Sequence, residues 1–157
     1  MKRNTIGAIS LGAVALALAA AVQSLFQESI LLGTAYLLLA SLAVPVVLFA
    51  FCAKCPDRGN CGHVLPGRAA VALFADRKCS AYTAGDWSMT TAGLAVLLLL
   101  PQIWLWKHPV AFVFFWLVMI PAVIGIRSGV CPSCRNVHCP GCSARTEKTG
   151  PRKESRS

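Results

Sequence analysis

The sequence has few charged residues, and its most apolar stretches have none. Charged residues make up 13% of the chain and hydrophobic residues 56%, with a mean hydropathy of +0.63. A soluble domain carries about 25% charged residues. This shortage argues against a soluble globular domain. Asp, Glu, Lys, Arg and His are absent from four apolar runs, which cover residues 5–25, 30–51, 89–106 and 109–126.

Each apolar run is long enough to cross a membrane as a helix. At about 1.5 Å per residue, roughly 20 residues span a hydrocarbon core of about 30 Å. The sequence therefore predicts an all-α integral membrane protein with four transmembrane helices and two cytoplasmic Cys-rich metal-binding loops. The predicted organisation is transmembrane helices 1 and 2 in residues 1–51, a cytoplasmic Cys-rich loop in 52–88, a transmembrane hairpin in 89–127, a cytoplasmic four-cysteine motif in 128–143 and a disordered basic tail in 144–157.

The first apolar run has a second interpretation. It follows Met1-Lys2-Arg3 and contains the small residues Ala19-Ala20-Ala21, which are features of a cleavable signal peptide. Its length favours a retained helix, as does the next apolar run a few residues later. Cleavage would leave three spans in the same orientation.

The basic residues predict the orientation. Lys107 is the only Lys or Arg that lies outside the N-terminus, the loop after the second run and the tail after the fourth. The positive-inside rule then puts both termini and the middle loop in the cytoplasm, in a multi-pass protein of the inner (cytoplasmic) membrane. The net charge of +9 also suits anionic membrane lipids. No nucleic-acid partner is expected, because no recognised binding motif is present.

All eight cysteines then lie on the cytoplasmic side, in two groups. Structural disulfides are disfavoured in this reducing compartment. Dense Cys-x-x-Cys pairs instead predict a metal, a cluster or a reactive dithiol. The first cysteine set is Cys52, Cys55, Cys61 and Cys79, and the second cysteine set is Cys131, Cys134, Cys139 and Cys142.

The second cysteine set gives the clearer prediction of a site. Its C-x2-C-x4-C-x2-C spacing brings four thiolates together, which would repel one another unless a cation held them. In the first cysteine set the fourth ligand is either Cys79 or His63. His63 follows Cys61 by two residues.

The predicted cofactor is an iron–sulfur cluster, such as a 4Fe–4S cluster, or zinc. Cys134, Cys139 and Cys142 reproduce the C-x4-C-x2-C spacing of plant-type ferredoxins. Zinc sites place their cysteine pairs farther apart along the chain than the second cysteine set does. The spacing therefore favours iron–sulfur.

The sequence lacks the residue patterns of hydrolytic enzymes and of ion-coupled transporters, which narrows the predicted function. No nucleophile–base pair or phosphate-binding loop is present, and ionisable residues typical of transporters are missing from the apolar runs. We therefore expect a non-catalytic subunit in membrane-associated electron transfer that binds one or two metal centres, with membrane lipids around it and a redox protein or quinone as partner. The alternatives are a structural zinc module for assembly or partner binding, and soft-metal handling by Cys52 and Cys55.

The architecture resembles that of membrane-bound ferredoxin-type proteins, which have four spans and cysteine motifs at the cytoplasmic helix ends. The C-x3-C-P motifs usual in that group are missing from this sequence. The resemblance therefore concerns architecture and does not imply quinol oxidation.

The sequence also makes five local predictions. Prolines and glycines argue against a helix through residues 52–67, and a short surface helix is expected over 68–79. Asp86 is expected to cap the third span. Small residues in the first span should allow another helix to approach closely. Kinks are expected at Pro45, Pro101 and Pro121.

Overall fold

The computed structural model describes residues 3–56, 58–62, 64–134 and 136, and the regular structure in these residues is all helical. It contains four helices that are long and apolar enough to cross a membrane, as predicted: Arg3–Glu28, Ile30–Cys52, Ala84–Leu105 and Pro109–Val130. The α-helices are α1 (Arg3–Glu28), α2 (Ile30–Val47), α3 (Val64–Leu73), α4 (Ala84–Leu98), α5 (Gln102–Leu105) and α6 (Pro109–Gly125). The shorter elements are two π-helical turns, Leu48–Cys52 and Ile126–Val130, and two 3₁₀ turns, Arg58–Asn60 and Cys131–Ser133.

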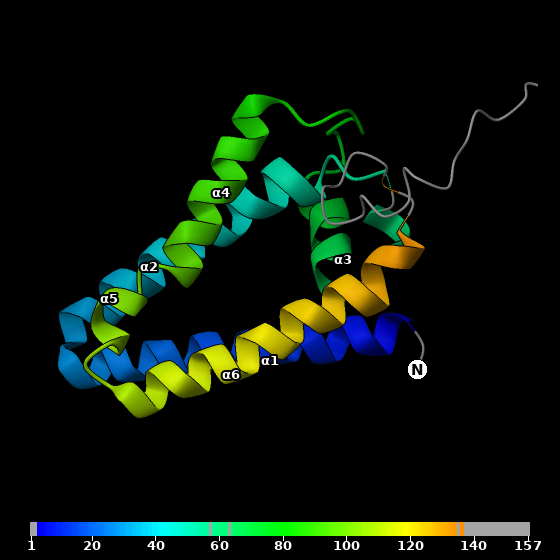
Figure 1. The fold of residues 1–157 in the computed structure, drawn as a ribbon. Helices are drawn as coiled ribbons and strands as arrows, with labels where there is room; N and C mark the ends of the chain where they lie inside the picture. Colours follow the sequence, from blue (N-terminus) through cyan, green and yellow to red (C-terminus); the bar gives the residue numbers. More distant parts are fainter. Residues whose placement is uncertain (1–2, 57, 63, 135, 137–157) are drawn as a thin grey trace, which may run out of the picture.

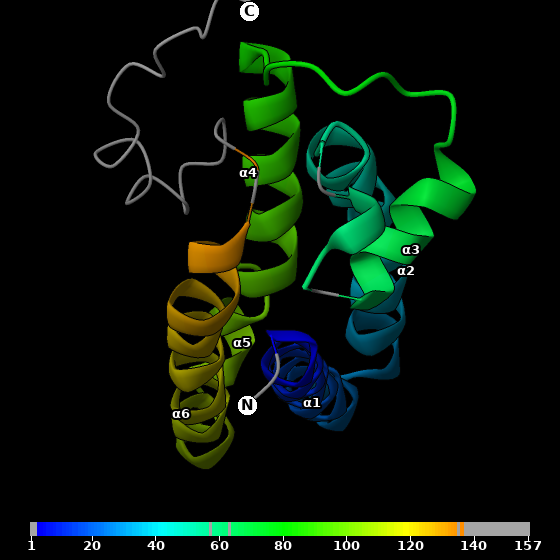
Figure 2. The same cartoon turned by 90° about the vertical axis from the view of Figure 1, so that its right-hand side faces the viewer.

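The long helices form two pairs that meet at one end of the molecule and diverge toward the other (Figure 1). One pair is α1 with α6, and the other is α2 with α4. The pairs meet near α5. At the diverging end, α3 lies beside the π-helical end of α2 and also contacts α1 (Figure 2). We call this the cysteine end, because residues 48–79 and 126–136 lie there.

Small residues let α1 and α6 pack closely. Ala17 and Ala21 have no exposed surface, and they form a core cluster with Phe115 and Met119 of α6. This confirms that small residues of the first span face a partner helix. Gly12 is an exception among the small residues of the first span, because a Cβ atom at this position would meet nothing within 4 Å.

A break between α4 and α5 surrounds Pro101. Proline has no N–H, so it cannot donate to the carbonyl oxygen of Leu97 four residues earlier. The Tyr36 hydroxyl of α2 donates to this oxygen instead, at 2.8 Å. The Gln102 side-chain amide donates to the carbonyl oxygen of Leu98 at 2.9 Å. These two side chains satisfy carbonyl groups that would be costly to leave unpaired in a membrane.

The third span begins earlier than its apolar run. Thr83 is the N-cap of α4, and it forms a capping box with Asp86. The prediction that Asp86 caps the third span is confirmed through this capping box, in which Thr83 is the N-cap residue. Asp86 lies in the first helical turn, where its carboxylate accepts a 2.8 Å hydrogen bond from the Thr83 backbone N–H.

The middle loop contains a helix that was predicted in the wrong place. α3 runs from Val64 to Leu73, so it includes Pro66 and Gly67 and ends well before residue 79. Pro66 is tolerated because the N–H groups of a first helical turn have no intrahelical partner. A Cβ at Gly67 would come within 2.6 Å of the Arg58 carbonyl oxygen, so only glycine fits where α3 packs against the preceding turn.

Candidate metal site

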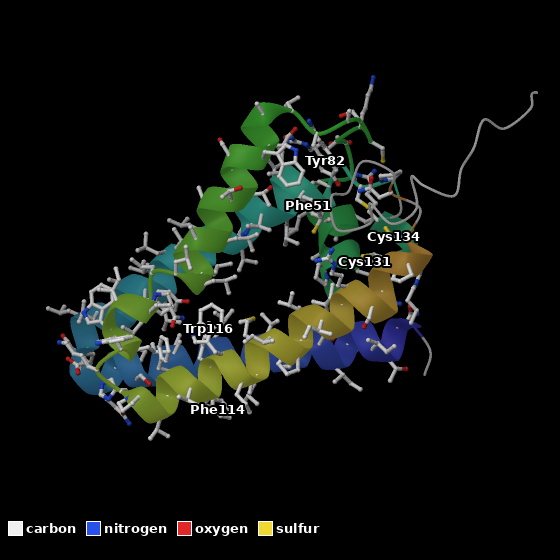
Figure 3. All side chains as sticks on the ribbon, in the orientation of Figure 1. Phe51, Tyr82, Phe114, Trp116, Cys131 and Cys134 are labelled. Atoms are coloured by element: carbon white, nitrogen blue, oxygen red, sulfur yellow. The ribbon has the colours of Figure 1, made fainter. Side chains whose placement is uncertain are left out.

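Both described Cys-x-x-Cys turns lie at the cysteine end, after the second and fourth candidate spans. Figure 3 shows Cys131 and Cys134 at this end, with the Phe51 and Tyr82 rings near them, whereas Phe114 and Trp116 lie toward the opposite end of α6. Cys55 and Cys134, which are 79 residues apart in sequence, are thus carried to one region by two different helix pairs.

The two turns have the same local structure. A π-helical turn ends at Cys52 in one case and directly before Cys131 in the other. The backbone N–H of Cys55 then donates to the Cys52 carbonyl oxygen at 3.2 Å, and the N–H of Cys134 donates to the Cys131 carbonyl oxygen at 3.1 Å. Pro45 and Pro121 lie inside the helices before these turns. π-helical turns are frequent at functional sites.

Some cysteines of the first cysteine set lie near one another. The Cys52 thiol interacts electrostatically with the thiols of Cys61 and Cys55. The Cys79 thiol, which is exposed, donates to the carbonyl oxygen of Cys55 with 3.6 Å between sulfur and oxygen. Cys79 therefore lies beside the turn, with its thiol directed at the backbone. His63, the other predicted fourth ligand, lies outside the described residues.

The guanidinium group of Arg58 holds the middle loop together. It donates to the carbonyl oxygens of Ala53 and Arg77 at 2.9 Å each, and to that of Ala75 at 3.2 Å. These carbonyls belong to the first and last parts of the loop between α2 and α4. Arg58 thus fixes the separation of the segments that carry Cys55 and Cys79.

A buried ion cluster connects the first turn to α4. Lys54 lies between Cys52 and Cys55, and its ammonium group forms a salt bridge with the Asp86 carboxylate. The guanidinium group of Arg77 binds the other oxygen of this carboxylate at 2.8 Å. With two cations around one carboxylate, the cluster has a net positive charge.

Asn136 connects the two cysteine sets. Its side-chain amide nitrogen Nδ2 donates to the sulfur of Cys55 at 3.5 Å and to the Tyr82 hydroxyl at 2.8 Å. Its backbone N–H donates to the sulfur of Cys134 at 3.5 Å. Asn136 is 2% exposed, so these contacts are shielded from solvent. One buried residue therefore contacts a cysteine from each set.

Backbone packing brings the sets together at a second point. A Cβ at Gly62, which follows Cys61, would lie 2.6 Å from Cγ1 of Val130, which precedes Cys131. The same atom would lie 3.1 Å from the Arg3 side chain. The middle loop therefore packs directly on the end of the fourth span and the start of the first.

The chemistry of this region is that of soft thiol donors. Thiolates bind zinc, copper(I) and iron–sulfur clusters. Within residues 3–56, 58–62, 64–134 and 136, no three Cys, His, Asp or Glu side chains are close enough together to form a ready metal-binding group. Cys139 and Cys142 of the second cysteine set lie outside these residues, so the predicted quartet of that set is described only at Cys131 and Cys134.

Sequence reasoning missed Asn136, Tyr82 and the Lys54–Asp86 ion pair. Asn136 has a weak signal in its position two residues after Cys134. Tyr82 stacks on Phe51, with ring centroids 5.0 Å apart, and contacts the Trp87 ring. No spacing rule identifies such partners, because each contact joins residues from different helix pairs or loops.

Comparison of the chain with protein-family models, curated protein sequences and solved structures gives no match.

Proposed function

We propose that this protein is a membrane-embedded metal protein whose cysteines hold a thiolate-bound centre on the cytoplasmic side of the inner membrane. The observation that carries the proposal is the pair of Cys-x-x-Cys turns with matching backbone hydrogen bonds at one end of the bundle. A Cys-x-x-Cys turn places two sulfurs next to each other, which is the arrangement that chelates one metal.

Hydrogen bonds to the sulfurs support thiolate binding. The side-chain amide of Asn136 donates to the Cys55 sulfur, and its backbone N–H donates to the Cys134 sulfur. Such hydrogen bonds stabilise a thiolate, which is the form that binds metals.

The proposed role is membrane-associated electron transfer through an iron–sulfur centre. The in-span hydroxyls of Thr34, Thr90 and Ser24 donate to carbonyls of their own helices. Among the described residues, these hydroxyls therefore offer no ready polar path for a transported ion. A centre at the membrane surface could exchange electrons with a quinone or a soluble redox protein.

Zinc is the alternative cofactor, and one measurement separates the two. The full-length protein is purified anaerobically in mild detergent, and its absorption spectrum and its iron and zinc content are recorded. A brown protein with several irons per chain supports the iron–sulfur centre. A colourless protein containing zinc overturns electron transfer and supports a structural role. A protein that binds neither iron nor zinc overturns the proposal.

The proposed orientation has its own test. Intact spheroplasts are treated with a membrane-impermeant maleimide, using the wild type and a Lys107→Cys variant. The native Cys79 should react only after permeabilisation, whereas the introduced cysteine at the exposed position 107 should react in intact cells. Reaction of Cys79 in intact cells would place the cysteine end outside.

A further inference from the structure

Two separate chain segments approach each other at the cysteine end, and the contacts between them involve metal-ligand residues. Asn136 donates to the sulfurs of Cys55 and Cys134, each at 3.5 Å. Because both donors belong to one residue, the Cys55 and Cys134 sulfurs are neighbours on either side of Asn136. The close contact between Gly62 and Val130 fixes the same two segments from another direction.

We propose that the two Cys-x-x-Cys turns share one metal centre, which is bound by Cys52 and Cys55 from the first half of the chain and by Cys131 and Cys134 from the second. This inference rests on the proposed function. The sequence leaves open whether there are one or two metal centres, and this inference commits to one centre that both cysteine sets share. It also makes Asn136 a positioning residue, which holds the two turns in register.

Metal chemistry favours this ligand set. Four thiolates supplied as two Cys-x-x-Cys pairs on separate segments form the usual tetrahedral four-cysteine site, which takes zinc or iron. The matching turns present such pairs. Cys79 is a poorer ligand, because its exposed thiol is directed at the Cys55 carbonyl oxygen. Cys61 interacts with Cys52 but belongs to no Cys-x-x-Cys pair.

Binding requires the four sulfurs to draw together. In the part of the chain that the structure describes, no three metal-ligating side chains form a closed group. Metal binding commonly completes the folding of such sites. The second turn follows the end of α6 through a π-helical and a 3₁₀ turn.

The test asks whether the metal losses caused by two single cysteine substitutions add up in the double variant. The full-length wild type, Cys55→Ser, Cys134→Ser and the double variant are purified anaerobically, and bound iron and zinc are measured per chain. A shared centre predicts that each single substitution removes the same metal, so the double variant loses no more than either one. The matched control Cys79→Ser should keep the wild-type content.

Other outcomes separate the two proposals. If the losses of the single variants add in the double variant, or if Cys79→Ser abolishes binding, the shared centre is overturned and the metal protein stands. If the wild type holds no metal, both proposals fall.

A measurement on the wild type avoids variants that fail to fold. Alkylation of each cysteine is followed by mass spectrometry while a chelator is titrated. The shared centre predicts that Cys55 and Cys134 become reactive at one chelator concentration. Two distinct midpoints would overturn it.

Discussion

The hydroxyl of Tyr36 donates a 2.8 Å hydrogen bond to the carbonyl oxygen of Leu97, the oxygen that Pro101 leaves without its helical donor. Tyr36 is 4% exposed, and the bond joins α2 to the end of α4. A sharp break inside an apolar span is thus made tolerable by a side chain from the neighbouring helix.

Tyr36→Phe should lower the stability of the protein by about 1–2 kcal/mol, because it leaves the Leu97 carbonyl unpaired. The measurement is thermal unfolding in detergent. In a Pro101→Ala background, residue 101 regains an N–H that can reach Leu97, so the same substitution should cost less. An equal cost in both backgrounds would show that the hydroxyl does not replace the missing donor.

Gly93→Ala should destabilise the packing of α4 on α2. The added Cβ would lie 2.6 Å from Cγ2 of Val47 and 3.4 Å from the carbonyl oxygen of Ala43, so the two helices must move apart. Overpacking of this kind costs about 1–3 kcal/mol. The matched control is Gly12→Ala in α1, where the Cβ meets nothing within 4 Å and helix propensity favours alanine by up to about 1 kcal/mol. Thermal unfolding of both variants in one detergent tests the contrast, and equal effects would contradict the close approach.

Asp86→Ala should be among the most damaging single substitutions. It removes the anion that pairs with Lys54 and Arg77, and it also removes half of the capping box with Thr83. Loss of one partner from a buried pair costs about 3–5 kcal/mol. The exposed Asp76→Ala serves as control and should be nearly neutral. Expression and unfolding temperature measure both, and a stable Asp86→Ala protein would contradict the role of the cluster.

Arg58→Lys should loosen the middle loop without changing its charge. A lysine ammonium cannot reproduce the planar set of donors that reaches Ala53, Ala75 and Arg77. A loss of about 1.4 kcal/mol in loop stability would raise proteolysis of this segment about tenfold. Arg68→Lys, at an exposed position in α3, is the control. Unchanged cleavage in Arg58→Lys would show that the loop is held by other contacts.

The spans were predictable from the sequence because the cost of placing a charge in a membrane leaves a clear pattern. Their ends were less predictable. Residues 84–88 look like loop, but Asp86 is neutralised by Lys54 and Arg77, so the third helix extends through it. Such compensation depends on partners that are brought near only by folding.

The cysteines and their place at the ends of the second and fourth spans could be identified from the sequence, but the contacts between the two sets could not. The Asn136 side chain reaches Cys55 across 81 positions of sequence, and asparagine carries no spacing signature. The position of α3 was missed for a related reason. Gly67 looks like a helix breaker until the close contact with Arg58 explains why a larger residue would not fit.

The pairing of α1 with α6 has a consequence for biosynthesis. The first helix emerges from the ribosome before its most extensive partner has been made. Until residues 109–130 have been made, Ala17 and Ala21 have no Phe115 or Met119 to pack against. The packing of α1 on α6 therefore waits for the last long helix, whereas α1, α2 and α4 can contact one another earlier.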